Sequence, residues 1–332
     1  MANNTGEHKQ LGWALIGCGG AGRRHATGAL ETPGVEVVGF CDVREASAIS
    51  FSEQHPGAYH TSDPERIFND PDIDIVSIAT AHNSHADLAI ATLDAGKHLW
   101  LEKPMAMTAS DCMRIDKALK KSGTKMMINF SIRFSGAARL IKDRIRPRVS
   151  HGQCMMAPAD LSTWRWHPVE GGGPLYDVGV HAVDFLCWIH DSDPVEVSAV
   201  GGQVTHPGEF GSSNLVDTAA ATLRFANGSV ATFLMSDAGS NDVVSKWFFE
   251  FFDGENSAIL DEHFSRARFS NGETVNPPPI DRLPFLVEAI RNDSEPYVSA
   301  SEGIRATRIV EKIAASIQTG LPQNFDDVPK DS

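Results

Sequence analysis

Short apolar segments alternate with amphipathic segments over the first 130 residues of the chain. The apolar runs have strand length and lie at residues 13–16, 35–41, 73–78 and 98–101. The segments between and after them carry apolar side chains at helical spacing and lie at residues 21–30, 45–55, 84–95 and 108–121. Continuous apolar strands separated by helices predict an α/β domain, in which a parallel sheet is covered on both faces.

The pattern changes after about residue 130, where turn signals separate pairs of strand-like segments. Asn227-Gly228 and Asp253-Gly254 are strong hairpin signals. The predicted strands around them are residues 217–225, 229–236, 246–252 and 257–260, and two helices are predicted at residues 284–291 and 300–319. Residues 247–252 are apolar at almost every position, so we expect both faces of this strand to be covered, by a helix or by a second copy of the chain. This half is predicted to be α+β with a mainly antiparallel sheet.

The length and charge limit the classes of protein. At 332 residues the chain exceeds the usual size of one core, so two domains are expected. We predict a disordered tail over residues 1–10, a first domain over residues 11–129 and a second over residues 130–332. The net charge of -14 opposes binding to nucleic acid or to an anionic membrane.

The cysteines and the apolar runs bear on the compartment. The five cysteines are scattered and include no Cys-x-x-Cys pair, which is typical of reduced thiols in a cytoplasmic protein. Residues 1–10 lack the order of a signal peptide. No apolar run approaches the roughly 18 residues of a membrane span. We therefore expect a cytoplasmic protein with no membrane partner.

A glycine-rich segment follows the first predicted strand and begins the first helix. Its sequence, Gly17-Cys18-Gly19-Gly20-Ala21-Gly22, has the spacing of the dinucleotide fingerprint. The glycines permit a tight turn and close approach of the backbone to a diphosphate at the helix N-terminus. Asp42 ends the second strand, where a carboxylate binds ribose hydroxyls. The combination predicts dinucleotide binding by Gly17, Gly19, Gly20, Gly22 and Asp42.

Asp42 and Arg44 bear on the choice of cofactor. A carboxylate at Asp42 accepts hydrogen bonds from the ribose hydroxyls of NAD and repels the 2'-phosphate of NADP. Arg44 lies two residues later and offers that phosphate a partner. We predict that NAD is favoured over NADP and count both residues among those that bind the cofactor.

Lys103 is the first candidate catalytic residue. It lies in Glu102-Lys103-Pro104, directly after a buried strand, at the edge where open parallel sheets bind ligands. A lysine at this place can stabilise the developing charge of an alkoxide. The alternative reading is an ordinary surface lysine.

Asp177 and His181 form the second candidate catalytic group. They follow three glycines at residues 171–173, and with Asp184 they would share one face of a helix. Histidine titrates near neutral pH and can take a proton from a hydroxyl. Beside a hydride acceptor, these groups predict an alcohol or polyol dehydrogenase. The alternative is a polar helix face that Asp177 caps.

The aromatic segment Trp164-Arg165-Trp166-His167 precedes the glycines and is expected on a loop over the pocket. Arg165 and Trp166 are tentative substrate contacts, and the alternative for Arg165 is a packed loop residue.

Two histidine pairs, His55 with His60 and His82 with His85, raise the question of a metal. Neither pair comes with cysteines or carboxylates at a recognised ligand spacing. No metal is therefore predicted.

Taken together, these motifs resemble the glucose-fructose oxidoreductase, inositol dehydrogenase and rhizopine-catabolism family, shortened to Gfo/Idh/MocA. The matching segments are the glycine loop with His25, Thr80 with His85, Ala95-Gly96-Lys97-His98, Glu102-Lys103-Pro104, Arg133-Phe134 and residues 171–184. The resemblance implies an α/β Rossmann N-terminal domain and an α+β C-terminal domain with an open, mostly antiparallel sheet that mediates oligomerisation. It implies NAD(P)-dependent chemistry on sugars, inositols or similar polyols, with Lys103, Asp177 and His181 as the catalytic set.

The chain departs from the family pattern after the strand at residues 73–78. The usual Thr-Pro-Asn-x-x-His reads Thr80-Ala81-His82-Asn83-Ser84-His85, so a histidine replaces an asparagine near the cofactor. A second departure is Gly136, where a proline is usual. By this resemblance the remaining cofactor-binding residues are Thr80, His82, His85 and Glu102.

The expected reaction is hydride transfer between a secondary hydroxyl of a polyol or sugar and the nicotinamide. Either Lys103 or His181 is the formal base, and Asp177 orients the substrate or the histidine. A homodimer or homotetramer through the C-terminal sheet is expected. Three alternatives stay open: a glycosidase that uses NAD transiently, a non-catalytic sugar-sensing regulator, and an oxidoreductase that never releases its cofactor.

Overall fold

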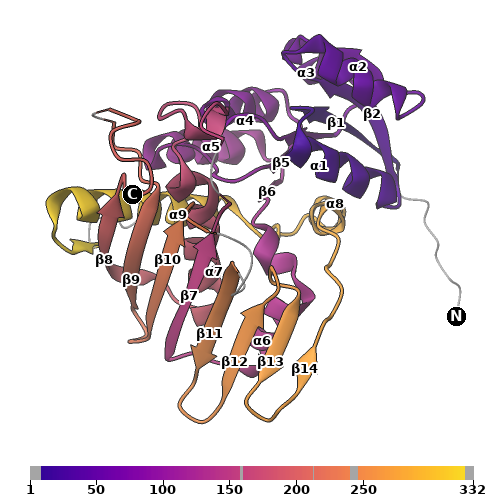
Figure 1. The fold of residues 1–332 in the computed structure, drawn as a ribbon. Helices are drawn as coiled ribbons and strands as arrows, with labels where there is room; N and C mark the ends of the chain where they lie inside the picture. Colours follow the sequence, from indigo (N-terminus) through magenta and orange to yellow (C-terminus); the bar gives the residue numbers. More distant parts are fainter. Residues whose placement is uncertain (1–8, 158–159, 212, 240–245, 326–332) are drawn as a thin grey trace, which may run out of the picture.

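The computed structural model describes residues 9–157, 160–211, 213–239 and 246–325. Its first half contains a parallel sheet with the strand order β3-β2-β1-β4-β5-β6 (Figure 1). The strands are β1 (Leu11–Ile16), β2 (Val35–Cys41), β3 (Tyr59–Thr61), β4 (Ile75–Ile78), β5 (His98–Leu101) and β6 (Met126–Ile128). The helices are α1 (Gly20–Glu31), α2 (Glu45–Glu53), α3 (Pro64–Phe68), α4 (His85–Asp94) and α5 (Ala109–Ser122). Every residue of β1 and β4 is buried, as a sheet covered on both faces requires, and the Rossmann prediction is confirmed.

The second half contains a larger sheet with the order β14-β13-β12-β11-β7-β10-β9-β8-β15. Its strands are β7 (Val149–Met155), β8 (Pro194–Gly202), β9 (Thr218–Phe225), β10 (Val230–Ser236), β11 (Trp247–Phe252), β12 (Ser257–Asp261), β13 (Arg266–Phe269), β14 (Thr274–Val275) and β15 (Gln323–Asn324). Strands β7 and β10 pair in parallel, and the other neighbours pair antiparallel. Both predicted hairpins are present, so the mostly antiparallel sheet is confirmed.

Within the described residues, helices cover one face of the aromatic strand β11. Phe249 and Phe251 are fully buried and pack against Phe185 of helix α7 (Val180–His190). On the other face, the side chain of Phe252 is 39% exposed. Among the described residues the helical cover lies on one side of this strand, so of the two predicted covers a helix accounts for one face. Cover by a second copy stays a prediction.

The C-terminal helices join the two sheets. Helix α9 (Ala300–Thr319) packs against α5 in the first half and against α7 and β8 in the second. The approach is close at Gly303, where a Cβ atom would lie 2.2 Å from Ile128 Cδ1. Helix α8 (Leu283–Arg291) packs against β5, and α6 (Gly136–Arg144) packs under β12 and β13. Because these late helices also cover the first sheet, the domain boundary at residue 129 stays a prediction. No helix in the described ranges is long and apolar enough to cross a membrane.

Candidate active site

A cavity of about 1280 Å³ lies between the glycine loop and the second half of the chain. We call the part lined by Gly17, Gly19, Gly20, Asp42 and Arg44 the nucleotide end. We call the part lined by His82, Lys103, Arg165, Asp177 and His181 the substrate end. The structure thus brings together residues that are well over a hundred positions apart in the sequence, such as Asp42 and His181.

The four glycines of the loop have two different roles. Gly17 has a φ of +102°, and a Cβ atom there would lie 2.4 Å from the carbonyl oxygen of Ala79. A Cβ atom on Gly22 would lie 2.1 Å from the carbonyl oxygen of Gly17, so both positions are closed by the protein itself. Gly19 and Gly20 have open space where a Cβ atom would be, and both line the cavity. Helix α1 begins at Gly20 without a side-chain cap, so its N-terminus is free to receive an anion.

Asp42 holds the glycine loop from the end of β2. Its Oδ2 accepts a hydrogen bond from the backbone N–H of Cys18 at 2.9 Å, and its Oδ1 accepts one from that of Arg44 at 2.9 Å. Each oxygen keeps a further lone pair for a ribose hydroxyl. The Arg44 side chain is 74% exposed, with its Nε 3.6 Å from Asp42 Oδ1. This end of the cavity therefore fits a dinucleotide.

Thr80 and His85 follow β4 and fix the turns beside the cavity. The hydroxyl of Thr80 lies 2.7 Å from that of Ser84, and Thr80 lines the cavity. His85 is fully buried and does not line it. Its Nδ1–H donates to the carbonyl oxygen of Pro104 at 2.7 Å. His85 is predicted to contact the cofactor, but its hydrogen bond in the structure holds the turn after Lys103.

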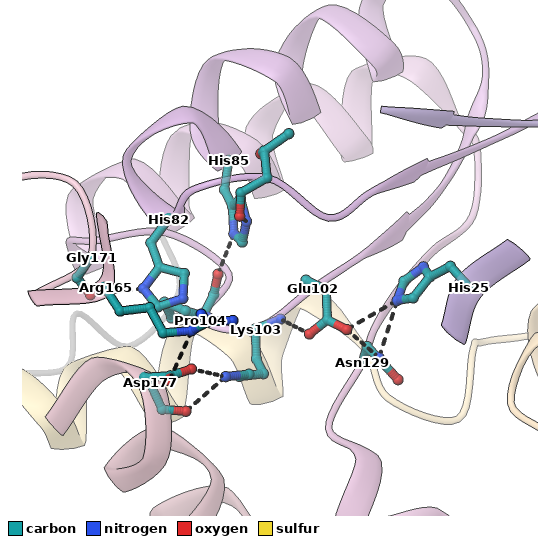
Figure 2. A network of polar contacts seen from close by, with 11 residues as sticks. His25, His82, His85, Glu102, Lys103, Pro104, Asn129, Arg165, Gly171 and Asp177 are labelled. Carbon is teal, nitrogen blue, oxygen red and sulfur yellow. Dashed lines mark hydrogen bonds and ion pairs between the residues drawn. The ribbon is translucent and has the colours of Figure 1, made fainter. Parts of the chain in front are cut away.

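Glu102 lies at the centre of a buried polar network (Figure 2). Its Oε1 lies 3.0 Å from Nε2 of His25 and accepts a hydrogen bond from Nδ2 of Asn129 at 2.7 Å. Burial alone would raise the pKa of this carboxyl, but the contacts with His25, Lys103 and Asn129 outweigh it and hold the pKa well below its usual range. The anionic Glu102 therefore fixes the backbone that carries Lys103.

Lys103 and Asp177 form an ion pair inside the cavity (Figure 2). Nζ of Lys103 donates to Oδ1 of Asp177 at 2.5 Å and to its backbone carbonyl at 2.7 Å. On the other side, Nε of Arg165 lies 3.4 Å from Oδ2 of Asp177. Burial would raise the pKa of Asp177, but Lys103, His82 and Arg165 together hold it well below its usual range. The Asp177 carboxylate thus holds both cationic side chains in place.

His181 lies in the first turn of α7 and is half-buried at the cavity wall. Burial first, and the charge of Lys103 second, lower its pKa to about 3. The imidazole is therefore neutral at pH 7, and one ring nitrogen carries a lone pair. Its Nδ1 has no hydrogen-bond partner among the described residues, and Asp177 is engaged by Lys103 instead.

The third member of the predicted helix face points elsewhere. Residues Leu175–Gly179 form a π-helical turn before α7, so the face departs from α-helical spacing. Asp184 accepts hydrogen bonds from Arg133 at 2.8 and 2.5 Å and does not line the cavity. Of the three residues of the predicted face, Asp177 and His181 thus line the cavity, whereas Asp184 belongs to a separate buried ion pair with Arg133.

Trp164, and not Trp166, lines the cavity beside Arg165. Trp166 is buried outside it and stacks on Phe210, with ring centroids 5.9 Å apart. The sequence predicts a loop at residues 164–167, but the way this loop folds decides which of its side chains faces the cavity. Arg24 and Arg282 also line the cavity, and Arg282 donates to Oδ1 of Asn129 at 3.3 Å. No motif marked these arginines, and α8 brings Arg282 to the first sheet only in the folded chain.

Comparison with known proteins gives a family for this arrangement. Residues 11–130 match the model described as an oxidoreductase family with an NAD-binding Rossmann fold, and residues 145–245 match the GFO/IDH/MocA C-terminal domain. The chain belongs to the Gfo/Idh/MocA oxidoreductase family. Within the described ranges, no group of three or more histidine, cysteine or acidic side chains could hold a metal ion.

Similar members of the family act as reductases and dehydrogenases. A 1,5-anhydro-D-fructose reductase of Ensifer adhaerens is 30% identical over 231 residues, which are 67% of this chain and 68% of that one. An inositol 2-dehydrogenase of Salmonella typhimurium is 30% identical over 188 residues, which are 54% of each chain. The aldose-aldose oxidoreductase of Caulobacter crescentus, solved with glycerol, is 25% identical with a TM-score of 0.84, covering 96% of this chain and all of that one. The fold and the oxidoreductase class of this Gfo/Idh/MocA protein agree with the predictions.

Proposed function

We propose that this chain is an NAD-dependent oxidoreductase that transfers a hydride between a secondary hydroxyl of a sugar, inositol or similar polyol and the nicotinamide. The observation that carries the proposal is the placement of Lys103, Asp177 and neutral His181 in the same cavity as an open glycine loop. The named substrates of similar family members are sugars and inositol, which supports this substrate class.

The nucleotide end supplies the groups that hold the cofactor. The backbone at Gly19 and Gly20 and the N-terminus of α1 face the position of a diphosphate, and Asp42 faces that of a ribose. The negative charge of Asp42 favours NAD over NADP, although Arg44 reduces this preference. When bound, the nicotinamide supplies the hydride acceptor or donor.

The substrate end supplies the groups that act on the hydroxyl. Lys103 has three N–H donors, and Asp177 accepts from two of them, which leaves one for the substrate oxygen. That donor stabilises the charge that develops on the oxygen during oxidation. His181 then takes the hydroxyl proton, since its imidazole is neutral at pH 7.

We further propose assembly through the outer face of the second sheet. The strand register places Val149, Val200, Leu234 and Phe252 on one face, and all four side chains are exposed. The helices lie on the opposite face, where Phe249 and Phe251 pack under α7. A second copy would cover this apolar surface, giving a homodimer or homotetramer. Light scattering on the purified protein measures the mass directly.

A panel of polyols, inositols and sugars with NAD tests the function. Reduced cofactor, followed by its absorbance, should accumulate with at least one member of the panel. Cleavage of glycosides without net cofactor reduction would instead indicate the glycosidase, and binding without turnover would indicate a regulator. If the cofactor stays with the protein through dialysis and substrates exchange hydride only with each other, the cofactor is never released.

A further inference from the structure

His82 occupies an unusual position between the two halves of the chain. It begins the short helical turn His82–Ser84 after β4, and its side chain is only 3% exposed. Its Nδ1 lies 2.8 Å from the carbonyl oxygen of Gly171, and the backbone N–H of Asn83 donates to the carbonyl oxygen of Glu170 at 3.1 Å. His82 is thus fixed to the segment that leads into Asp177.

The contact with Gly171 decides which nitrogen of His82 carries the hydrogen. A carbonyl oxygen only accepts, so Nδ1 must be the donor. Burial first, and the charge of Lys103 second, lower the pKa of His82 to about 3, so the ring is neutral. Nε2 then has a free lone pair and no hydrogen. No described residue donates a hydrogen bond to Nε2, and His82 lines the cavity.

The cationic side chains at the substrate end offer no acceptor to a second hydroxyl of the substrate. Lys103 and Arg165 are donors only, and both are held by the Asp177 carboxylate. Trp164 lies with its ring centroid 4.8 Å from that of His82, in an edge arrangement. A polyol carries further hydroxyls next to the one that reacts, and a buried hydroxyl needs an acceptor for its hydrogen.

We propose that Nε2 of His82 accepts a hydrogen bond from a second hydroxyl of the substrate, so that the site selects polyols with a hydroxyl close to the one oxidised. The inference rests on the proposed function and names its substrate class more closely. The predicted role of His82 was in cofactor binding, and a ribose hydroxyl of the cofactor offers the same chemistry. The hydrogen bond to Gly171, the ring contact with Trp164 and the cavity wall shared with Lys103 and Asp177 place His82 on the substrate side.

Two substitutions separate the two hydrogen bonds of His82. In His82→Asn, the side-chain amide N–H can still reach the carbonyl of Gly171, but no acceptor remains where Nε2 was. His82→Ala removes both. For myo-inositol or D-glucose, whichever the wild-type protein oxidises, kcat/KM should fall about tenfold to a hundredfold in His82→Asn. The NAD dissociation constant should stay within about twofold, and the melting temperature should fall in His82→Ala only.

Monodeoxy analogues show which hydroxyl is bound. The wild-type protein should lose the same tenfold to hundredfold in kcat/KM when one hydroxyl of that polyol is removed, and His82→Asn should lose nothing further with that analogue. His190→Asn is the matched control, because His190 is buried between Ser150 and Ser229, away from the cavity. It should lower the melting temperature and leave the loss caused by the deoxy analogue unchanged.

The possible failures are distinct. If the wild-type protein oxidises the polyol and His82→Asn discriminates the deoxy analogues as before, the inference is wrong and the proposed function stands. A tenfold rise in the NAD dissociation constant with unchanged discrimination would assign Nε2 to the cofactor ribose and overturn the substrate role. If the wild-type protein oxidises no polyol, the proposed function fails, and the inference fails with it.

Discussion

The two ends of the cavity are built in different ways. The nucleotide end comes from one stretch of chain, in which the backbone N–H of Gly17 donates to the carbonyl oxygen of Cys41 at 2.8 Å. The backbone N–H groups of Cys18 and Arg44 donate to the Asp42 carboxylate at 2.9 Å. The substrate end comes from side chains on separate elements, such as Lys103 after β5 and His181 on α7. Backbone amides do not change charge, whereas buried side chains shift the pKa values of their neighbours. Under the proposed function, the nucleotide end binds the cofactor and the substrate end carries the chemistry.

The largest effect is expected from substitutions that disrupt the substrate end alone. Lys103→Ala and His181→Ala should each lower kcat by about a hundredfold to ten-thousandfold, because general acid–base catalysis and charge stabilisation are lost. The affinity for NAD should change little. Turnover with the best polyol of the panel and NAD titration measure both quantities. If both folded variants kept near-normal turnover, the catalytic assignment would be wrong. Asp177→Asn should be intermediate, since it keeps the shape but removes the charge.

Acid should destabilise the protein through its buried side chains. The pKa values of His82 and His181 are lowered to about 3 and that of His190 to about 4, mainly by burial. The pKa of a histidine in the unfolded chain is about 6.5, so below that pH the unfolded chain binds protons that the native chain does not. The free energy of unfolding should fall by about 1.4 kcal/mol per pH unit for each such histidine. The lowered pKa values of Glu102 and Asp177 add a further loss below about pH 4.

Denaturant unfolding between pH 4 and pH 8 measures this loss. His190→Gln, which lies outside the cavity, should weaken the dependence on pH between 4 and 6.5 and leave the affinity for NAD unchanged. A flat profile between pH 6.5 and 4.5 would contradict the neutral, buried state of these histidines.

A smaller effect on NAD affinity is expected from substitutions of two glycines at the nucleotide end, Gly22 and Gly20. In Gly22→Ala, the new Cβ atom meets the carbonyl of Gly17, so we expect a lower melting temperature together with weaker NAD binding. In Gly20→Ala, the space is open, so the melting temperature should stay the same. NAD affinity should still fall about tenfold or more, because the methyl group lies where the cofactor approaches. Unchanged NAD affinity in Gly20→Ala would place the diphosphate elsewhere.

The smallest expected effect concerns the ribose. The wild-type protein should bind NAD about tenfold more tightly than NADP, because a residual repulsion of about 1.4 kcal/mol from Asp42 remains after the contribution of Arg44. Arg44→Ala should widen the preference, and Asp42→Ala should narrow it. Titration with both cofactors measures the ratio. Equal affinities for NAD and NADP in the wild-type protein would overturn the predicted preference for NAD. The melting temperature of Asp42→Ala is the control, because Asp42 also accepts two hydrogen bonds from the backbone of the loop.

Much of the fold could be predicted because its signals are local. The apolar run of β1, the glycine loop and the two hairpin turns each act over a few residues, and the structure has all of them. The sequence left open what covers each face of β11, because burial of a strand face depends on elements far away in the sequence. The same limit explains Trp166, whose place outside the cavity follows from its stacking on Phe210.

The sequence by itself determined the type of each half, the cofactor loop and the chemical groups at Lys103, Asp177 and His181. These features follow from residue identity and from short spacing. Only the tertiary structure decided that Asp177 pairs with Lys103, that Asp184 pairs with Arg133, and that His82 binds Gly171. The physical reason is that hydrogen bonds and burial depend on distance in space, and no local pattern carries the distance between residues that lie about 50 to 90 positions apart.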